Sequence, residues 1–260
     1  MAKPGKFFYN IFKNSIVLIL FFALWEIAPR IGLLDHQFVP TLSETVSTIV
    51  KLAINGELFV HIGFSLGRAL AGFVLASFIA LTLGFLLGGW FKTFEELLTP
   101  FLQVMAQINP FSVFPLFILL FGIGEVAKIA IILWVCIWPI MFNTINGVKN
   151  IDPLTIKAAR TMGTNKFVLF WKVVLPGAAP SIFTGIKLGA GNSFFMLIAA
   201  EMLGASAGLG WLVLNSERNY QIPNLYAAMI VIAVLGITIT NLINLAEKKI
   251  IVWKEDNVAG

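Results

Sequence analysis

Four long stretches of the chain contain no charged residue, and they constrain its fold more than any other feature. They are Ala69–Phe91, Leu97–Ile123, Ile129–Val148 and Ile222–Ala246. A helix needs about 20 mostly apolar residues to cross the hydrocarbon core of a bilayer, and each stretch reaches that length. The sequence therefore predicts an all-α membrane protein.

The composition supports this prediction. Hydrophobic residues make up 58% of the 260 residues and charged residues only 12%, whereas a soluble domain usually has about 25% charged residues. Such a chain has too few charges to cover a water-facing surface. The same composition excludes a disordered chain, a disulfide scaffold and a nucleic-acid-binding domain. Cys136 is the single cysteine, so no disulfide can form within the chain.

Two further stretches carry charges only near their ends. One is Ser181–Leu203, and the other is Ile11–Ala28. The second follows several lysines and could be read as a signal peptide, but Pro29 comes next and no small-x-small cleavage pattern follows, so we expect a retained anchor. We predict one domain over 1–260, a polytopic helical bundle with six crossings at about 11–28, 66–91, 97–123, 126–148, 181–203 and 222–246.

The basic residues predict the orientation of this bundle. With the N-terminus in the cytoplasm, twelve of the 18 Lys and Arg residues fall on the cytoplasmic side. Short cytoplasmic loops are enriched in Lys and Arg. We therefore expect both termini in the cytoplasm, and this bias explains the net charge of +5 without a polyanionic partner.

A short helix is expected on the outer side at about 41–55. Thr41 and Glu44 have the spacing of a capping box, in which each side chain satisfies a backbone N–H of the other residue. Asn55-Gly56 then ends the segment. This segment is too polar to cross the bilayer, so we expect it to lie along the outer interface.

The cytoplasmic loop 149–180 is predicted to hold two helices. Asp152-Pro153 provides an N-cap and a first-turn proline for a helix that ends at Met162, before Gly163. Asn165 then begins a second helix that runs to Leu175-Pro176. This hairpin could lie on the membrane surface as a simple connection, or it could dock a partner, and the residues alone leave both interpretations open.

One motif in this loop resembles that of a known family. Lys157-Ala158-Ala159 is followed by three residues, Gly163, nine residues and Val173–Pro176. The order and spacing resemble the Glu-Ala-Ala loop of binding-protein-dependent ABC importer permeases. Lys157 departs from the pattern, because it stands where the family has Glu, and this reverses the charge at the first position of the motif.

The resemblance extends over roughly residues 20 to 250. Further stretches are similar to the nitrate, sulfonate, taurine and bicarbonate branch of the family: Leu24–Glu26, Ser65–Arg68, Phe121–Glu125, Ala199–Ala205 and Gly208–Gly210. The resemblance implies a type I (MetI-like) permease in a bacterial inner membrane. It also implies three kinds of partner: a second permease copy, with a homodimer as the simplest assembly, two cytoplasmic ATPase subunits and an extracytoplasmic binding protein.

By this resemblance, the helix 153–162 is the coupling helix, which sits in a groove of the ATPase. The residues implied in coupling are Asp152, Pro153, Lys157, Ala158, Ala159, Arg160, Gly163, Leu175 and Pro176. The cargo would be a small, mostly anionic solute whose identity the chain does not reveal. No cofactor is expected on this chain, and ATP with Mg would bind the partner ATPase.

Catalytic chemistry is not expected on this chain. Gly5-Lys6 is followed by Phe7 and lacks the upstream glycine of a P-loop. His36 and His61 are the only histidines, 25 positions apart, and we do not expect them to form a metal site. The chain is therefore predicted to be a translocation subunit and not an enzyme.

Polar residues within the apolar stretches are candidates for the transport pathway, because ionisable groups at membrane depth usually face a bundle interior or water. Arg68 and Glu201 fall at similar depth, and we predict that they pair, either to lock two helices or to form a gate. Lys187 could attract an anion, but we expect it to extend to the headgroups. The remaining candidates are Gln107, Asn109 and Ser112, beside helix-breaking prolines, and Asn192 and Ser193.

The predicted mechanism is alternating access driven by a separate ATPase. The alternative is an autonomous, proton-coupled secondary transporter in which Glu201 carries the proton; many such folds contain inverted repeats, and none is visible here. An intramembrane enzyme lacks a suitable cluster of His, Cys or paired carboxylates. The glycine pairs Gly84/Gly88 and Gly185/Gly189 predict close helix contacts.

Overall fold

The computed structural model describes the backbone of residues 4–251 and, within that range, all side chains except those of residues 4–15, 90 and 92. Every regular element in this part of the chain is helical. In chain order the elements are α1 (Pro4–Arg30), α2 (Leu42–Ile54), α3 (Glu57–Phe85), the π-helix η1 (Leu86–Trp90), α4 (Lys92–Gln107), α5 (Pro110–Phe121), α6 (Glu125–Lys149), α7 (Pro153–Thr161), α8 (Lys166–Leu169), the π-helix η2 (Phe170–Val174), α9 (Leu175–Gly204), α10 (Leu209–Arg218) and α11 (Ile222–Ile250).

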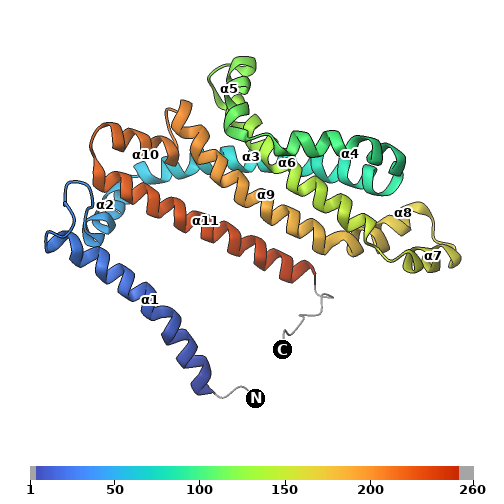
Figure 1. Cartoon of the computed structure of the whole chain (residues 1–260), viewed down its shortest axis with the longest axis horizontal. Coiled ribbons are helices and arrows are strands. Elements are labelled where there is room, and N and C mark those ends of the chain that lie inside the picture. The colour runs from blue at the N-terminus through green and yellow to red at the C-terminus, as the bar shows by residue number, and fades with distance from the viewer. Residues whose placement is uncertain (1–3, 252–260) are drawn as a thin grey trace.

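The helices form an elongated bundle with different short helices at its two ends. Figure 1 shows α2 and α10 at one end of the long axis and α7 and α8 at the other, with α9 running between them. We refer to these as the α10 end and the α7 end. α1 leans away from the bundle, and near the α10 end its Trp25 donates a hydrogen bond to the Pro40 carbonyl.

Four helical segments are long and apolar enough to cross a membrane. They are Glu57–Gly89, Glu125–Lys149, Lys166–Gly204 and Ile222–Ile250. The last three contain the crossings predicted at about 126–148, 181–203 and 222–246. The first covers most of the crossing predicted at about 66–91, but it begins earlier, at Glu57, and ends at Gly89. The crossing predicted at 11–28 falls on α1, and the side chains of its first five residues lie outside the described residues.

The stretch predicted as one crossing at 97–123 is two helices. α4 and α5 are bent by 92° at a short break. Ile108 and Asn109 are extended there. Asn109 comes directly before Pro110, and the residue before a proline disfavours the helical region. The Asn109 side chain then accepts a hydrogen bond from the Phe111 N–H over 2.9 Å and caps α5. The stretch predicted as one crossing is therefore a bent pair of helices and not one straight helix.

The short helices predicted by capping signals are present. Thr41 and Glu44 form the capping box at the start of α2. Asp152 caps α7 by accepting from the Leu154 N–H over 2.9 Å. Gly163 ends that hairpin turn with a φ of 78°, a region that glycine enters without the steric cost of a Cβ.

The second helix of the loop was predicted to end at Leu175-Pro176, but it continues past these residues. It begins after the Asn165 cap, passes through η2 and continues into α9, so that Lys166–Gly204 is one helical body of 39 residues. Pro176 lacks an N–H, and its ring crowds the carbonyl four residues earlier. That position, Lys172, lies in the wider π-turn, where a regular α-helical bond is not required.

α6 is the centre of the packing, because glycines on its neighbours allow close approach. A Cβ on Gly84 of α3 would lie 2.6 Å from Cβ of Thr144 on α6, and one on Gly185 of α9 would lie 2.8 Å from the Pro139 carbonyl oxygen of α6. A Cβ on Gly189 would lie 3.0 Å from the Ile140 side chain. The predicted close contacts at these glycines are confirmed.

We expect Gly185→Ala to lower the free energy of unfolding by about 1–3 kcal/mol, as overpacking does, because the obstructing atom belongs to the backbone of α6. The matched control is Gly191→Ala in the same helix, where nothing lies within 4 Å of the new Cβ and a gain of up to about 1 kcal/mol in helix propensity is expected. Thermal unfolding of the detergent-solubilised chain measures both. Equal shifts for the two variants would show that α9 does not depend on this contact.

Candidate functional site

A buried ion pair joins α3 and α9 near the α10 end. Nη1 of Arg68 donates to Oε1 of Glu201 over 2.7 Å, and the two side chains are 4% and 0% exposed. The predicted pairing of these residues is therefore present. A buried charge requires compensation by a partner and by further hydrogen bonds, and the neighbouring elements provide both.

The start of α10 and Ser65 of α3 supply the other donors to Glu201. The Gly210 N–H donates to Oε2 over 2.9 Å, and the Ser65 hydroxyl of α3 lies 2.9 Å from both carboxylate oxygens. Ser65 in turn accepts from the Leu209 N–H over 2.8 Å. The first N–H groups of a helix have no partner within the helix and favour negative charge. The carboxylate thus satisfies the start of α10, and α10 stabilises the carboxylate.

Two glycines make room for this carboxylate. Gly208 has a φ of 126°, and a Cβ there would overlap the carboxylate of Glu201. A Cβ on Gly210 would overlap the Ile198 carbonyl oxygen. The motif Gly208-Leu209-Gly210 therefore serves as a close helix contact around a charged group. α10 itself was not predicted, because its cap is the side chain of a residue on another helix.

A second carboxylate extends the cluster towards the surface. Arg68 also binds Glu125 through Nε and through Nη2, the latter over 2.9 Å to Oε1, and donates to the Ala207 carbonyl over 2.6 Å. Lys128 donates to Oε1 of Glu125 over 3.0 Å. Two cations and two carboxylates thus balance one another. Glu125 is the exposed member, with a side chain 55% exposed, while Lys128 is buried.

His61 packs beside this cluster as a structural residue. Its Nδ1 accepts from the Gly208 N–H over 3.1 Å, and its ring stacks on Trp211 at 5.2 Å between centroids. These contacts hold the loop before α10. Among the residues that the structure describes, no group of three His, Cys, Asp or Glu side chains could hold a metal ion.

The other pathway candidates lie apart from the ion cluster. Gln107, Asn109 and Ser112, around the bend between α4 and α5, are exposed, and so is Asn192 on α9. Ser193 is buried, and its hydroxyl donates to the Ala190 carbonyl of its own helix over 2.8 Å. Within the described part of the chain, no hydrogen bond joins these residues to Arg68 or Glu201.

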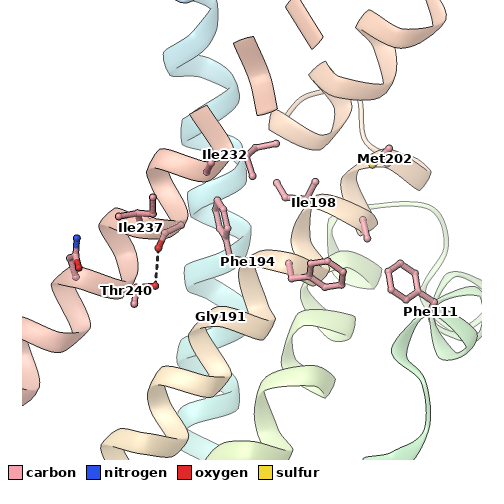
Figure 2. Close-up of a pocket in the computed structure, with 13 residues that line it drawn as sticks. Phe111, Gly191, Phe194, Ile198, Met202, Ile232, Ile237 and Thr240 are labelled. Atoms are coloured by element: carbon pink, nitrogen blue, oxygen red, sulfur yellow. Dashed lines mark hydrogen bonds between the residues drawn. The ribbon is translucent and has the colours of Figure 1, made fainter. Parts of the chain in front are cut away.

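An apolar groove of about 730 Å³ lies between α5, α9 and α11. Figure 2 shows Phe194 and Ile198 of α9 opposite Ile232 and Ile237 of α11, with Phe111 of α5 on the far side. Its lining includes Gly191, next to Asn192, and Phe111, next to Ser112. The polar residues that line the groove itself are Thr240 and Asn241 of α11.

Lys187 differs from its expected role. It forms an ion pair with Glu247 of α11, and its side chain is 32% exposed. The pair joins α9 to α11, so Lys187 has a protein partner and does not need to extend to the headgroups. No local pattern indicates this contact, because α9 and α11 are far apart in the sequence and each carries more than one charge.

The residues of the loop motif separate into exposed and buried groups. Ala159 is 5% exposed, and its carbonyl accepts from the N–H and the hydroxyl of Thr164, so it supports the loop from inside. Leu175 and Pro176 are half-buried at the start of α9. The exposed motif residues are Asp152, Pro153, Lys157, Ala158, Arg160 and Gly163.

Three residues of the ion cluster were not predicted as site residues. Ser65, Glu125 and Lys128 complete the contacts around Arg68 and Glu201. Glu125 and Lys128 stand three positions apart at the start of an apolar stretch, so each could have been noted as a charge at the membrane edge. Their convergence with Arg68 depends on helix packing, which hydropathy does not encode.

Comparisons with known proteins relate most of the chain to one family. The family model described as "binding-protein-dependent transport system inner membrane component" matches residues 80–250. The chain is 33% identical, over 97% of its length and 91% of the relative, to a putative aliphatic sulfonates transport permease protein, SsuC, of Bacillus subtilis (strain 168). It is 30% identical to the nitrate import permease protein NrtB of Leptolyngbya laminosa, over 96% of the chain and 91% of that protein.

One solved structure shares the fold. It is an inward-facing conformation of the MetNI methionine ABC transporter, with a TM-score of 0.53 over 72% of this chain and 95% of the matched chain. The sequence identity is 18%, so this match carries the fold alone.

We expect Arg68→Met to destabilise the chain by about 3–5 kcal/mol, because it leaves the buried carboxylate of Glu201 without its charged partner. The double variant Arg68→Met with Glu201→Gln removes both charges, and its loss should be smaller than the sum of the two single losses. Thermal unfolding in detergent measures all three variants. Arg218→Met, an exposed arginine on α10, is the control and should change stability by less than about 0.5 kcal/mol; additive losses would contradict a functional ion pair.

Proposed function

Because the chain belongs to the family of binding-protein-dependent transport system inner membrane components, we propose that it passes a small anionic solute from an extracytoplasmic binding protein to the cytoplasm by alternating access. It is an ABC transporter permease of the branch that includes the aliphatic sulfonate and nitrate permeases. In this proposal a separate ATPase drives transport, and α7 receives the movement of that ATPase.

The observation that carries the proposal is the surface of α7. This helix is separately capped at Asp152 and is followed by Met162 and Gly163. Leu154 and Met162 are 71% and 76% exposed. Large apolar side chains this exposed at a helical hairpin, outside the four apolar spans, indicate a protein contact. We therefore assign α7 to ATPase docking.

The basic residues support an orientation with the α7 end in the cytoplasm. Lys157, Arg160, Lys166 and Lys172 all lie in the segment 149–180, which has one acidic residue, Asp152. This excess of positive charge favours the cytoplasmic side. The α10 end, with the Arg68–Glu201 pair, then faces the binding protein.

The exposed polar residues of α4, α5 and α9 support a transport pathway along the surface that these helices share. In lipid, an amide without a hydrogen-bond partner costs several kcal/mol, yet in the described part of the chain the side chains of Gln107 and Asn192 make no hydrogen bond. We infer that they face a water-filled path or a second copy of the chain. A homodimer with the path between the copies satisfies both conditions.

The contacts of Glu201 argue against the proton-coupled alternative. Arg68, Ser65 and the Gly210 N–H all donate to its carboxylate. These donors enclose the carboxylate, whose side chain is 0% exposed, whereas a proton carrier must be within reach of water or of another proton donor. The geometry therefore suits a fixed structural charge or a gate better than a carrier.

We expect Leu154→Asp to abolish co-purification of the ATPase with the tagged chain, since it places a charge where an apolar side chain is proposed to be buried. Because Leu154 is exposed in the free chain, the variant should keep the wild-type unfolding temperature. The control is Leu33→Asp, also a highly exposed leucine at 72% but in the loop before α2, and it should retain the ATPase. Retention of the ATPase by Leu154→Asp would remove α7 from the docking surface.

Transport itself is tested in proteoliposomes that contain the chain, its ATPase and its binding protein. We expect uptake of an alkanesulfonate, taurine or nitrate to require ATP on the cytoplasmic side and not to be driven by a proton gradient alone. Uptake driven by the gradient without the ATPase would favour the secondary transporter.

A further inference from the structure

The hairpin of α7 and α8 carries positive charge that the chain itself does not neutralise. Lys157, Arg160 and Lys166 are exposed, and no ion pair involves them among the residues the structure describes. Lys149, by contrast, at the start of the segment, pairs with Glu95. Asp152, the only acidic residue between 149 and 180, accepts the Leu154 N–H as a helix cap.

Apolar side chains lie among these cations. Leu154, Ala158 and Met162 follow one another at intervals of four positions, so they share one face of α7. Phe167 on α8 is 71% exposed. We call the set of Leu154, Lys157, Arg160, Met162, Lys166 and Phe167 the hairpin surface. It combines exposed apolar side chains with cations on the flank of α7, and protein interfaces likewise combine apolar contacts with polar groups at their edge.

The position of the hairpin favours a protein over lipid as the occupant. The apolar part of α9, residues 181–203, is about 34 Å long at 1.5 Å per residue, enough for a hydrocarbon core of about 30 Å. The same helical body continues back to Lys166, which adds about 22 Å. The headgroup region is only about 5–8 Å thick on each side, so the hairpin lies beyond the reach of the phosphates.

We propose that the hairpin surface docks into an apolar groove of the ATPase whose rim carries carboxylates facing Lys157, Arg160 and Lys166. This inference rests on the proposed function and adds the chemistry of the partner surface. Lys157 stands where the motif of similar permeases has Glu, so the acidic rim also selects the partner: an ATPase with a basic rim would be repelled.

Charge reversal on the hairpin tests the proposal. The tagged chain is co-expressed with the ATPase of its transport system, and the affinity of the purified pair is measured at about 0.1 M and about 1 M salt, where the Debye length falls from about 10 Å to about 3 Å. We expect Lys157→Glu and Arg160→Glu each to weaken binding at least about tenfold at low salt, since like charges across an interface are costly. High salt should reduce the difference.

Two controls keep the result specific. Lys51→Glu makes the same change in net charge on an exposed residue of α2, at the α10 end, and should bind the ATPase as the wild type does. Lys157→Gln removes the charge without reversing it and should give an intermediate affinity. Acid-to-lysine substitutions along the ATPase groove should include at least one that restores binding to Lys157→Glu.

The outcomes separate this inference from the proposed function. If the wild type binds the ATPase but Lys157→Glu binds equally well at both salt concentrations, the acidic rim is wrong and the docking assignment stands. If the wild type binds no ATPase, the proposed function fails. If charge reversal instead weakens binding to vesicles that contain anionic lipid and leaves ATPase binding unchanged, the hairpin surface is a membrane contact and the inference is overturned.

Discussion

The structure at the α10 end depends on one buried carboxylate. Glu201 is fully enclosed, and its charge is compensated by a guanidinium from α3, a hydroxyl from α3 and a backbone N–H from α10. A charge in this environment is tolerated only when every partner is in place. Three separate helices must therefore meet in one geometry, and a shift of any one of them leaves polar groups unpaired. Separation of these helices would therefore break several of these contacts at once.

That property suits a residue that separates two states of a transporter. The exposed member, Glu125, shares Arg68 with Glu201 and also binds Lys128. In the proposed alternating access, a movement of α9 relative to α3 would exchange one set of contacts for another rather than stretch them. The packing of α6 limits where such movement occurs, because Gly84 and Gly185 hold α3 and α9 against it at backbone distance.

Local signals in the sequence predicted the parts of the fold that depend on local chemistry. The capping box of Thr41 and Glu44, the Asp152 cap and the end of the helix before Gly163 were all predicted correctly. Each of them is decided by residues within a few positions of one another. The pairing of Arg68 with Glu201 was predicted for a different reason, since two opposite charges at similar membrane depth have few other partners.

The features that were missed are decided by tertiary contacts. Hydropathy depends on how apolar the residues are and not on the path of the backbone. The apolar stretch 97–123 therefore did not reveal the 92° bend at Asn109. Proline at 176 was read as a stop, although the π-turn η2 accommodates it within a continuous helix. α10 begins where the side chain of Glu201, nine positions earlier, caps it. No local pattern identifies such a cap.

The continuity of α8, η2 and α9 links the two ends of the molecule. One helical body runs from Lys166, beside the hairpin surface, to Gly204, beside the Glu201 cluster. A straight helix transmits displacement along its length. Near the α7 end, however, the π-helix η2 and the prolines at 176 and 180 interrupt the regular hydrogen bonding, so the helix bends most easily there. In the proposed alternating access, a push on the hairpin would bend this body near η2, and the part of α9 beyond the bend would move together with α6, against which it packs at Gly185. The ion pair between Lys187 and Glu247 couples that unit to α11, so the wall of the apolar groove, which α9 and α11 share, would move with it as one surface.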